Sequence, residues 1–197
     1  MSKANDMSEF RILALSGSLR VASLNTAMLN MATLCLPPGL HMSVHATLGD
    51  LPLFNPDLES HAPSAVEQLQ GCIAAADALL IASPEYAHGV SSVMKNALDW
   101  MVGSGVFVDK PVVLWNAAPR ATHALAALRE TLTVMSARLL VDAELALLIQ
   151  QGALGQAPSN PDQAAMRRAM VIIKNTLERE RSAQGSRHPL PGPSWPR

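Results

Sequence analysis

The segment 16–25, which reads SGSLRVASLN, gathers side chains that suit an anion. Short hydroxyl and amide side chains surround one charged residue, Arg20, and Gly17 permits an unusual backbone angle directly after an apolar run. A helix that begins here would add unpaired N–H groups and the positive end of its dipole. Such a convergence of amides, hydroxyls and one guanidinium suits a phosphate. The candidate phosphate ligands are Ser18, Arg20, Ser23 and Asn25.

A structural interpretation of the same segment stays open. Ser23 can simply cap the following helix, and the other serines can simply form the turn. That interpretation explains each serine alone, but it explains less well an arginine placed among four polar side chains. The segment matches neither GxGxxG nor GxxxxGK[ST], so the dinucleotide and nucleoside-triphosphate motifs are absent. A single phosphate monoester therefore fits better than a pyrophosphate.

A second segment, 83–90, reads SPEYAHGV and has the composition of an exposed recognition loop. Pro84 stiffens the turn and exposes its backbone, and Gly89 allows close approach. Tyr86, the only tyrosine of the chain, and His88 supply planar groups. Such a loop can lie along the edge of a flat ring and offer it main-chain donors and acceptors. The alternative is an ordinary surface turn before a helix.

For the helix after this loop we prefer a structural interpretation. Lys95 and Asp99 are spaced to form an i,i+4 ion pair, and Trp100 is typical of a core or subunit contact.

The elements that would position these two loops alternate between strand-like and helix-like segments. Short apolar runs predict buried strands at residues 10–15, 40–46, 78–82 and 112–118 and within 138–149. Helical spacing predicts helices at residues 24–35, 66–76, 91–101, 125–135 and 162–182. The segments 47–62 and 150–161 are rich in turn residues and read as loops.

This alternation predicts βαβ units, and hence an open parallel sheet with helices on both faces. In such a sheet, ligands bind beyond the carboxyl ends of the strands, where the strand order reverses. The loops that matter are then 16–25, 83–90 and 116–122. We expect an N-terminal segment 1–8 that is flexible, one domain at 9–182 and a Pro-rich tail at 183–197.

The composition sets limits on the class of protein. Hydrophobic residues make up 49% and charged residues 16%, which excludes disorder over most of the chain. The net charge of -1 gives no strong attraction for nucleic acid or for an anionic membrane. No apolar run reaches the ~18 residues of a membrane span, and the N-terminus lacks the apolar core of a secretory signal. Cys35 and Cys72 are predicted to be buried, inert thiols in a cytoplasmic protein.

Nothing in the sequence indicates a metal site or a catalytic triad. No nucleophile, base and orienting residue fall into a recognisable set, so we assign no catalytic side chain. The histidines match no zinc pattern; they are His41, His45, His61, His88, His123 and His188.

Two motifs together carry a family resemblance. GSLRxxSxN at Gly17–Asn25 and SPEYAHGxxxxxKNALDW at Ser83–Trp100 resemble the NADPH-dependent FMN reductase family of the flavodoxin-like superfamily. The similarity runs in matching order from about Arg11 to Val141 and includes the strand and helix of 112–132. It implies a flavodoxin-like α/β fold: an open five-stranded parallel sheet, order 2-1-3-4-5, with helices on both faces.

The resemblance also implies a cofactor and its ligands. FMN would be bound tightly, with its phosphate on Ser18, Arg20, Ser23 and Asn25. The isoalloxazine would be lined by Pro84, Glu85, Tyr86, Ala87, His88 and Gly89, with Asn116 near it. Family members are commonly dimers or dimers of dimers, which implies a homodimer or homotetramer. One departure is Ser91-Ser92, where family members often carry Pro-Gly; serine can still cap the helix there.

The function predicted from the resemblance is an NAD(P)H-dependent, FMN-containing reductase. Hydride would pass from NADPH or NADH to flavin N5, and electrons then to a quinone, flavin, azo or metal-oxyanion acceptor. Main-chain amides of the loop 116–122 would stabilise the reduced ring. His88, Arg120 and His123 are candidates to contact the substrate or the 2′-phosphate of NADPH, although plain surface exposure explains them equally well.

Two other classes of protein stay open. One is a flavodoxin-type electron carrier without nicotinamide turnover, which the weak net charge disfavours because such carriers usually have a strongly acidic surface. The other is a flavin-free regulatory or structural domain on the same scaffold.

Overall fold

The computed structural model describes residues 9–45, 48–150 and 157–185. The expectations for the N-terminal segment 1–8 and for most of the tail, 186–197, lie outside these residues.

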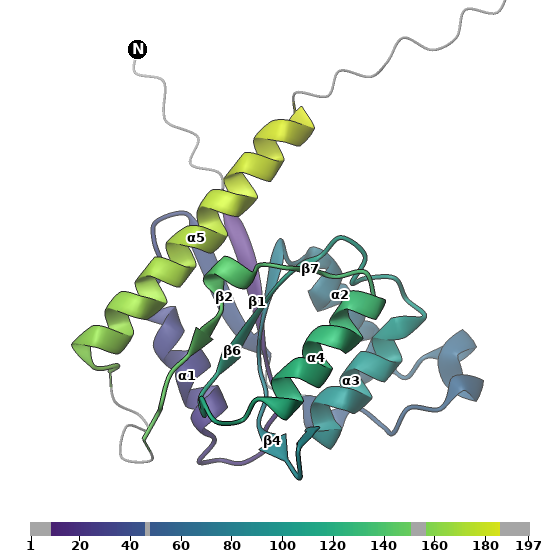
Figure 1. Ribbon diagram of the computed structural model, residues 1–197. Coiled ribbons are helices and arrows are strands. Elements are labelled where there is room, and N and C mark those ends of the chain that lie inside the picture. Colours follow the sequence, from purple (N-terminus) through teal and green to yellow (C-terminus); the bar gives the residue numbers. More distant parts are fainter. Residues whose placement is uncertain (1–8, 46–47, 151–156, 186–197) are drawn as a thin grey trace, which may run out of the picture.

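The centre of the fold is a parallel sheet in the order β2-β1-β3-β6-β7, with β8 also paired to β6 (Figure 1). The strands are β1 (Phe10–Ser16), β2 (Leu40–His45), β3 (Ala78–Ala82), β6 (Pro111–Asn116), β7 (Arg138–Leu139) and β8 (Leu145–Ala146). Every pairing in this sheet is parallel. The predicted flavodoxin-like order 2-1-3-4-5 is confirmed, with β7 and β8 sharing the fifth position.

The predicted last strand within 138–149 is in fact divided. A single 3-10 turn, Val141–Ala143, separates β7 from β8. The indole Nε1 of the buried Trp115 donates to the carbonyl of Ala143 at 3.0 Å. A carbonyl that the turn removes from the ladder therefore keeps a hydrogen bond inside the core.

Helices cover both faces of the sheet and form two separate cores. On one face lie α1 (Leu24–Thr33) and α5 (Asn160–Gly185), and on the other lie α2 (Ser64–Ala75), α3 (Ser92–Val102) and α4 (His123–Val134). The alternation along β1 sends Ile12 to the first core and Leu13 to the second. Within the described ranges, no helix combines the length and apolarity needed to cross a membrane.

Three local predictions need correction. The segment 47–62 contains two 3-10 helices, Leu48–Asp50 and Pro56–His61, and is not an irregular loop throughout. Helix α5 continues to Gly185, beyond the predicted end at residue 182. The prediction of two buried thiols is right for Cys35 and wrong for Cys72, which is exposed.

The exposure of Cys72 follows from helix geometry. The buried residues of α2 are Val66, Leu69 and Ile73. Cys72 precedes Ile73 by one position, and one position turns the side chain by about 100° around a helix of 3.6 residues per turn. Cys35, by contrast, lies beneath α1 and α5, where burial raises the pKa of its thiol.

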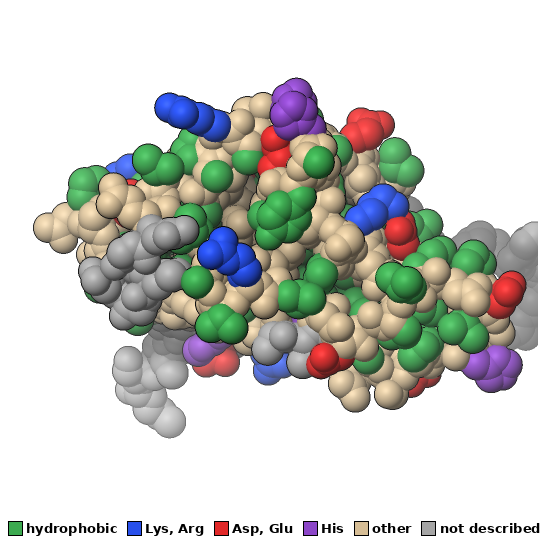
Figure 2. Space-filling view, turned by 90° about the horizontal axis from the view of Figure 1, so that it is seen from below, with side chains coloured by type: hydrophobic (Ala, Val, Ile, Leu, Met, Phe, Trp, Pro, Cys, Tyr) green, Lys and Arg blue, Asp and Glu red, His purple; other side chains and the backbone are tan. Residues whose placement is uncertain are grey.

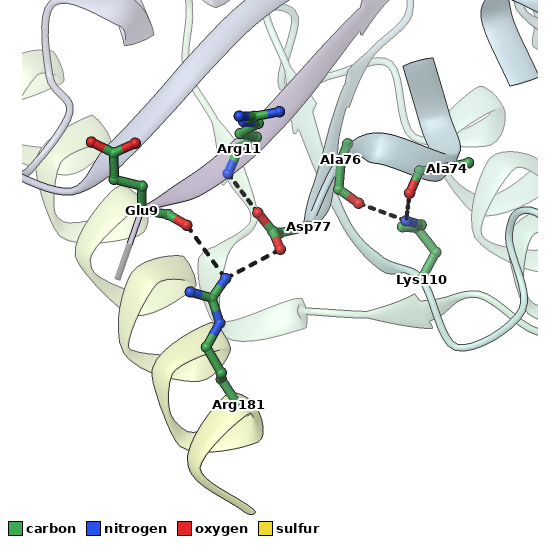
Figure 3. A network of polar contacts seen from close by, with 7 residues as sticks. All are labelled: Glu9, Arg11, Ala74, Ala76, Asp77, Lys110 and Arg181. Carbon is green, nitrogen blue, oxygen red and sulfur yellow. Dashed lines mark hydrogen bonds and ion pairs between the residues drawn. The ribbon is translucent and has the colours of Figure 1, made fainter. Parts of the chain in front are cut away.

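A polar network fastens α5 to the amino-terminal edge of the sheet (Figure 3). The carboxylate of Asp77 accepts from the backbone N–H of Arg11 at 2.7 Å and from the Arg181 guanidinium at 3.4 Å. The same guanidinium lies 3.8 Å from the centre of the Phe10 ring. Lys110 donates to the carbonyl of Ala76 at 2.6 Å, at the end of α2. This edge is therefore fixed by structural contacts, opposite to the edge where a ligand is expected.

Replacement of Asp77 should measure the strength of this network. Asp77→Ala leaves the Arg11 N–H without its acceptor and the Arg181 guanidinium with the Glu9 carbonyl in place of both acceptors. We expect a loss of about 1–2 kcal/mol in the free energy of unfolding. Asp77→Asn keeps an acceptor for the Arg11 N–H and should lose less than half of that. Urea unfolding of the two variants checks this. Equal stability of Asp77→Ala and the wild type would contradict the assigned role.

Candidate functional site

Three loops meet at the carboxyl-terminal edge of the sheet. They follow β1, β3 and β6, whose carboxyl-terminal ends lie side by side. Ser16 pairs with Ala82, and Ala82 pairs with Trp115, the last residue but one of β6. Figure 2 shows this edge face-on, with acidic, basic and apolar side chains interspersed and no large field of one charge. The topology therefore brings the loops 16–25, 83–90 and 116–122 to one edge, as the sequence predicts.

The loop after β1 packs very closely against the loop after β3. The N–H of Gly17 donates to the carbonyl of Ala82 at 2.9 Å. A Cβ on Gly17 would lie 2.3 Å from Ser83 Oγ and 2.8 Å from Ser91 Oγ. The two hydroxyls are 3.2 Å apart and can bond to each other. Only glycine fits at position 17, and its absent side chain is what lets the two loops touch.

The serines of the first loop already have partners in the chain. Ser23 is the N-cap of α1, and its Oγ accepts from the N–H of Thr26 at 3.2 Å. Ser18 Oγ accepts from the N–H of Arg20 at 3.3 Å. The capping interpretation of Ser23 is thus confirmed. Each hydroxyl keeps its own proton, however, and can still donate it to an anion.

Arg20 and Asn25 differ from the serines because, among the described residues, no group pairs with the Arg20 guanidinium or with Asn25 Oδ1. The Arg20 side chain is exposed, and across residues 9–45, 48–150 and 157–185 no carboxylate forms an ion pair with it. Asn25 lies in the first turn of α1 and is only 8% exposed. Its Oδ1 is buried and finds no hydrogen-bond partner in the part of the chain that the structure describes. A buried amide oxygen without a partner is unfavourable, and a rotated amide would present an N–H donor at the same place.

The second loop is a tight hairpin rather than an irregular turn. β4 (Glu85–Tyr86) and β5 (Gly89–Val90) pair antiparallel. The two residues between them, Ala87 and His88, have φ of 48° and 61°. Positive φ at both central residues is the pattern of a type I′ turn, which normally selects Asn-Gly. The sequence Ala-His gave no signal for it, so sequence analysis predicted only a loop.

This hairpin, β4–β5, is joined to the start of α4 by two contacts that the sequence did not reveal. Glu85 Oε2 accepts from the N–H of Ala124 at 2.9 Å. The rings of His88 and His123 stack with centroids 4.1 Å apart and planes inclined by 21°. Tyr86 remains 56% exposed. Pro84 directly precedes β4 and Gly89 is the first residue of β5. All six predicted ring-lining residues therefore lie together, although the Glu85 carboxylate is turned to α4.

Asn116 shapes the third loop from within. Its side chain is 5% exposed at the end of β6. Oδ1 accepts from the N–H of Ala118 and Nδ2 donates to the carbonyl of Ala121, both at 2.9 Å. Arg120, at the tip of this loop, is exposed. The Asn116 side chain therefore holds the loop 117–121 in shape, a role that a search for ligand-binding residues would not assign.

The residues that we interpreted as structural are structural. Lys95 and Asp99 form an ion pair at 2.6 Å. Trp100 is buried in the second core and donates to the carbonyl of Pro52 at 2.8 Å. Ser91, one of the two serines that depart from the family pattern, is the N-cap of α3 and accepts from the N–H of Met94. In the described part of the chain, no group of three or more His, Cys, Asp or Glu residues is placed to hold a metal ion.

The sheet order and the polar loop after β1 define a flavodoxin-like α/β protein. Comparison with known proteins makes the assignment narrower. The sequence profile described as NADPH-dependent FMN reductase matches residues 10–151. The chain belongs to this family.

Several relatives match the chain over part of its length. An NAD(P)H-dependent FMN reductase of Pseudomonas aeruginosa is 43% identical over 93 residues, which cover 47% of this chain and 50% of that protein. An NADPH:quinone oxidoreductase of Arabidopsis thaliana is 43% identical over 110 residues, or 53% of this chain and 56% of the relative. The matched segments thus span about half the length of these relatives.

Solved structures support the fold. The flavoenzyme FerB of Paracoccus denitrificans, an NAD(P)H:(acceptor) oxidoreductase, superposes with a TM-score of 0.77 at 24% identity. The superposition covers 86% of this chain and 98% of FerB. A flavodoxin from the domain Archaea gives a TM-score of 0.58 at 13% identity, over 85% of this chain and 99% of that one.

Substitution of Gly17 should test the close contact between the first two loops. Gly17→Ala forces a Cβ into the Ser83 and Ser91 hydroxyls, and we expect a loss of about 1–3 kcal/mol in the free energy of unfolding. Gly71→Ala is the matched control, because Gly71 is exposed in α2 and no atom lies within 4 Å of its Cβ position. The control should gain about 0.5–1 kcal/mol. Urea unfolding of both variants measures the difference; the same change in both would refute the contact.

Proposed function

We propose that this protein is an NAD(P)H-dependent reductase with bound FMN that passes electrons to quinone, flavin, azo or metal-oxyanion acceptors. The family assignment supports the reaction class. The observation that carries the proposal is the buried, unpartnered Oδ1 of Asn25 in the first turn of α1, beside the loop closed by Gly17. A polar atom buried without a partner in the chain is expected where a ligand completes the site.

The donor set of the first loop fits the phosphate of FMN. Ser18, Arg20, Ser23 and Asn25 would hold it together with the N–H groups at the start of α1. The guanidinium supplies the positive charge, and its freedom from carboxylates leaves it available. The serine hydroxyls can donate their protons while still accepting from the backbone. The absence of a Gly-rich diphosphate loop agrees with one phosphate rather than two.

The loops after β3 and β6 would form the ring-binding part of the site. Main-chain groups of the hairpin, Pro84 to Gly89, would lie along the isoalloxazine, and Tyr86 would limit access to it. Asn116 would act indirectly, because its side chain shapes the loop 117–121. The N–H groups of that loop would favour negative charge on the ring. The chemistry that FMN supplies when bound is acceptance of hydride from a nicotinamide and release of electrons to a second substrate. The protein would bind FMN, orient its ring and exclude water from it.

We infer further that the chain works as a homodimer or homotetramer in the cytoplasm, with residues 9–182 as the flavin-binding domain. Val102, Val108 and Val134 are 60%, 56% and 74% exposed and line one groove between α3 and α4, which supports self-association. The two free thiols suit a reducing compartment.

An absorbance spectrum of the purified protein, before and after anaerobic addition of NADPH or NADH, tests the proposed function. We expect flavin bands that bleach when the nucleotide is added and return on addition of a quinone. Bands that persist with both nucleotides would indicate an electron carrier. A colourless protein that takes up no added FMN would indicate a flavin-free domain. Either result contradicts the proposal.

Loss of the Arg20 guanidinium should weaken FMN binding. A hydrogen bond to a charged group contributes roughly 1.5–3 kcal/mol, so Arg20→Ala should lower the affinity by roughly one to two orders of magnitude. Arg168→Ala is the control, because it removes an exposed arginine from α5, and it should leave the affinity for FMN unchanged. Fluorescence titration of the apoproteins with FMN measures both. Unchanged affinity in Arg20→Ala would refute the assignment.

Replacement of Asn25 should weaken FMN binding and leave the stability of the apoprotein almost unchanged. Asn25→Ala removes a buried oxygen that has no partner, so the apoprotein should keep its free energy of unfolding to within about 1 kcal/mol. The affinity for FMN should fall by about ten-fold or more, because one donor to the phosphate is lost. Urea unfolding and FMN titration of the same variant provide the two readouts. A destabilised apoprotein with normal FMN affinity would assign Asn25 to the fold alone.

A further inference from the structure

The turn of the hairpin β4–β5 adopts a backbone conformation that its own residues disfavour. Ala87 and His88 both have positive φ, and neither is glycine or asparagine. Such residues persist in this region only when the surrounding structure holds them there. The contacts that hold this hairpin must therefore come from outside it.

The start of α4 lacks a hydrogen bond that the hairpin supplies. Its N-cap, Thr122, makes no side-chain hydrogen bond to the first turn. The N–H of Ala124, in that turn, would lack a partner within the helix. It donates instead to Glu85 Oε2, from a residue 39 positions earlier in the chain. A carboxylate at this end of a helix also interacts favourably with the helix dipole.

We propose that Glu85 is a positioning residue that caps α4 and thereby fixes the main chain of the hairpin β4–β5 for the flavin ring. This inference rests on the proposed function. The Glu85 carboxylate faces α4, so it acts through the backbone of Pro84 to Gly89 and touches no substrate. The stacking of His88 on His123 supports the turn of the same hairpin against the same helix turn. Through these two contacts, the first turn of α4 and the hairpin β4–β5 hold each other in place.

The coupling gives a measurable consequence in the wild-type protein. If the hairpin backbone contacts the ring, bound FMN holds the hairpin in place and with it the Glu85 carboxylate on Ala124 N–H. Amide hydrogen exchange in the first turn of α4 should then slow when FMN binds. The first turn of α2 serves as the reference. Its Glu67 is exposed and, among the described residues, forms no hydrogen bond or ion pair with the hairpin. Its exchange should not change.

Three variants separate positioning from general stability. Glu85→Ala removes the acceptor for Ala124 N–H, Glu85→Gln keeps a neutral acceptor, and Glu67→Ala removes a carboxylate from the first turn of α2. We expect Glu85→Ala to lower FMN affinity by about ten-fold, within the usual range for coupled sites. Glu85→Gln should recover most of that loss, and Glu67→Ala should bind FMN as the wild type does.

The experiment combines FMN titration with hydrogen exchange on the full chain. Support consists of slowed exchange at the start of α4 on FMN binding, lost affinity in Glu85→Ala and recovery in Glu85→Gln. The role of Glu85 is overturned if FMN does not change hydrogen exchange at the start of α4 in the wild type. It is also overturned if Glu85→Ala binds FMN as tightly as the wild type. In both cases the proposed function stands. If Glu85→Ala fails to fold, the wild-type exchange and the Gln variant still decide. Wild-type protein that binds no FMN overturns both proposals.

Discussion

The close approach of two loops at the carboxyl edge of the sheet is the constraint on which the site depends. Gly17 bonds to the last residue of β3 and leaves no room for a Cβ between itself and the hydroxyls of Ser83 and Ser91. Because Ser91 is also the N-cap of α3, the same contact fixes where that helix begins. The loop after β1 is therefore positioned by β3 and α3. This loop in turn sets where α1 begins.

Some polar side chains at this edge stabilise the loops, and others are available to a ligand. Ser23 and Asn116 use their side chains to cap a helix and to shape a turn. Within residues 9–45, 48–150 and 157–185, Arg20 and Asn25 make no such contacts, and the Asn25 oxygen is buried without a partner. A protein that needed only stability would place an apolar side chain there. The unsatisfied group is understandable if a ligand completes the site, and in the proposed function that ligand is the phosphate of FMN.

The sequence was informative where structure depends on neighbours along the chain, and less so elsewhere. The buried run Ala78–Ala82 is the third strand as predicted, because a run of only five apolar residues that ends at a turn is too short for a typical helix and fits a strand buried on both faces. The hairpin at 85–90 was missed because Ala87 and His88 adopt positive φ against their own preference. The bond from Glu85 to Ala124 joins residues 39 apart, and no local pattern encodes it. The prediction that the segments 17–25 and 83–90 share one edge is confirmed, because they follow neighbouring parallel strands. The roles of their side chains toward a ligand stay a prediction.

The most direct test of this account compares the binding of FMN with that of riboflavin, which lacks the phosphate, by calorimetric titration of the apoprotein. If the loop after β1 grips the phosphate with Arg20 and the start of α1, FMN should bind at least about a hundred-fold more tightly, as several charge-assisted hydrogen bonds would give. Equal affinities for the two flavins would contradict the account, because the first loop would then contribute nothing to the ligand.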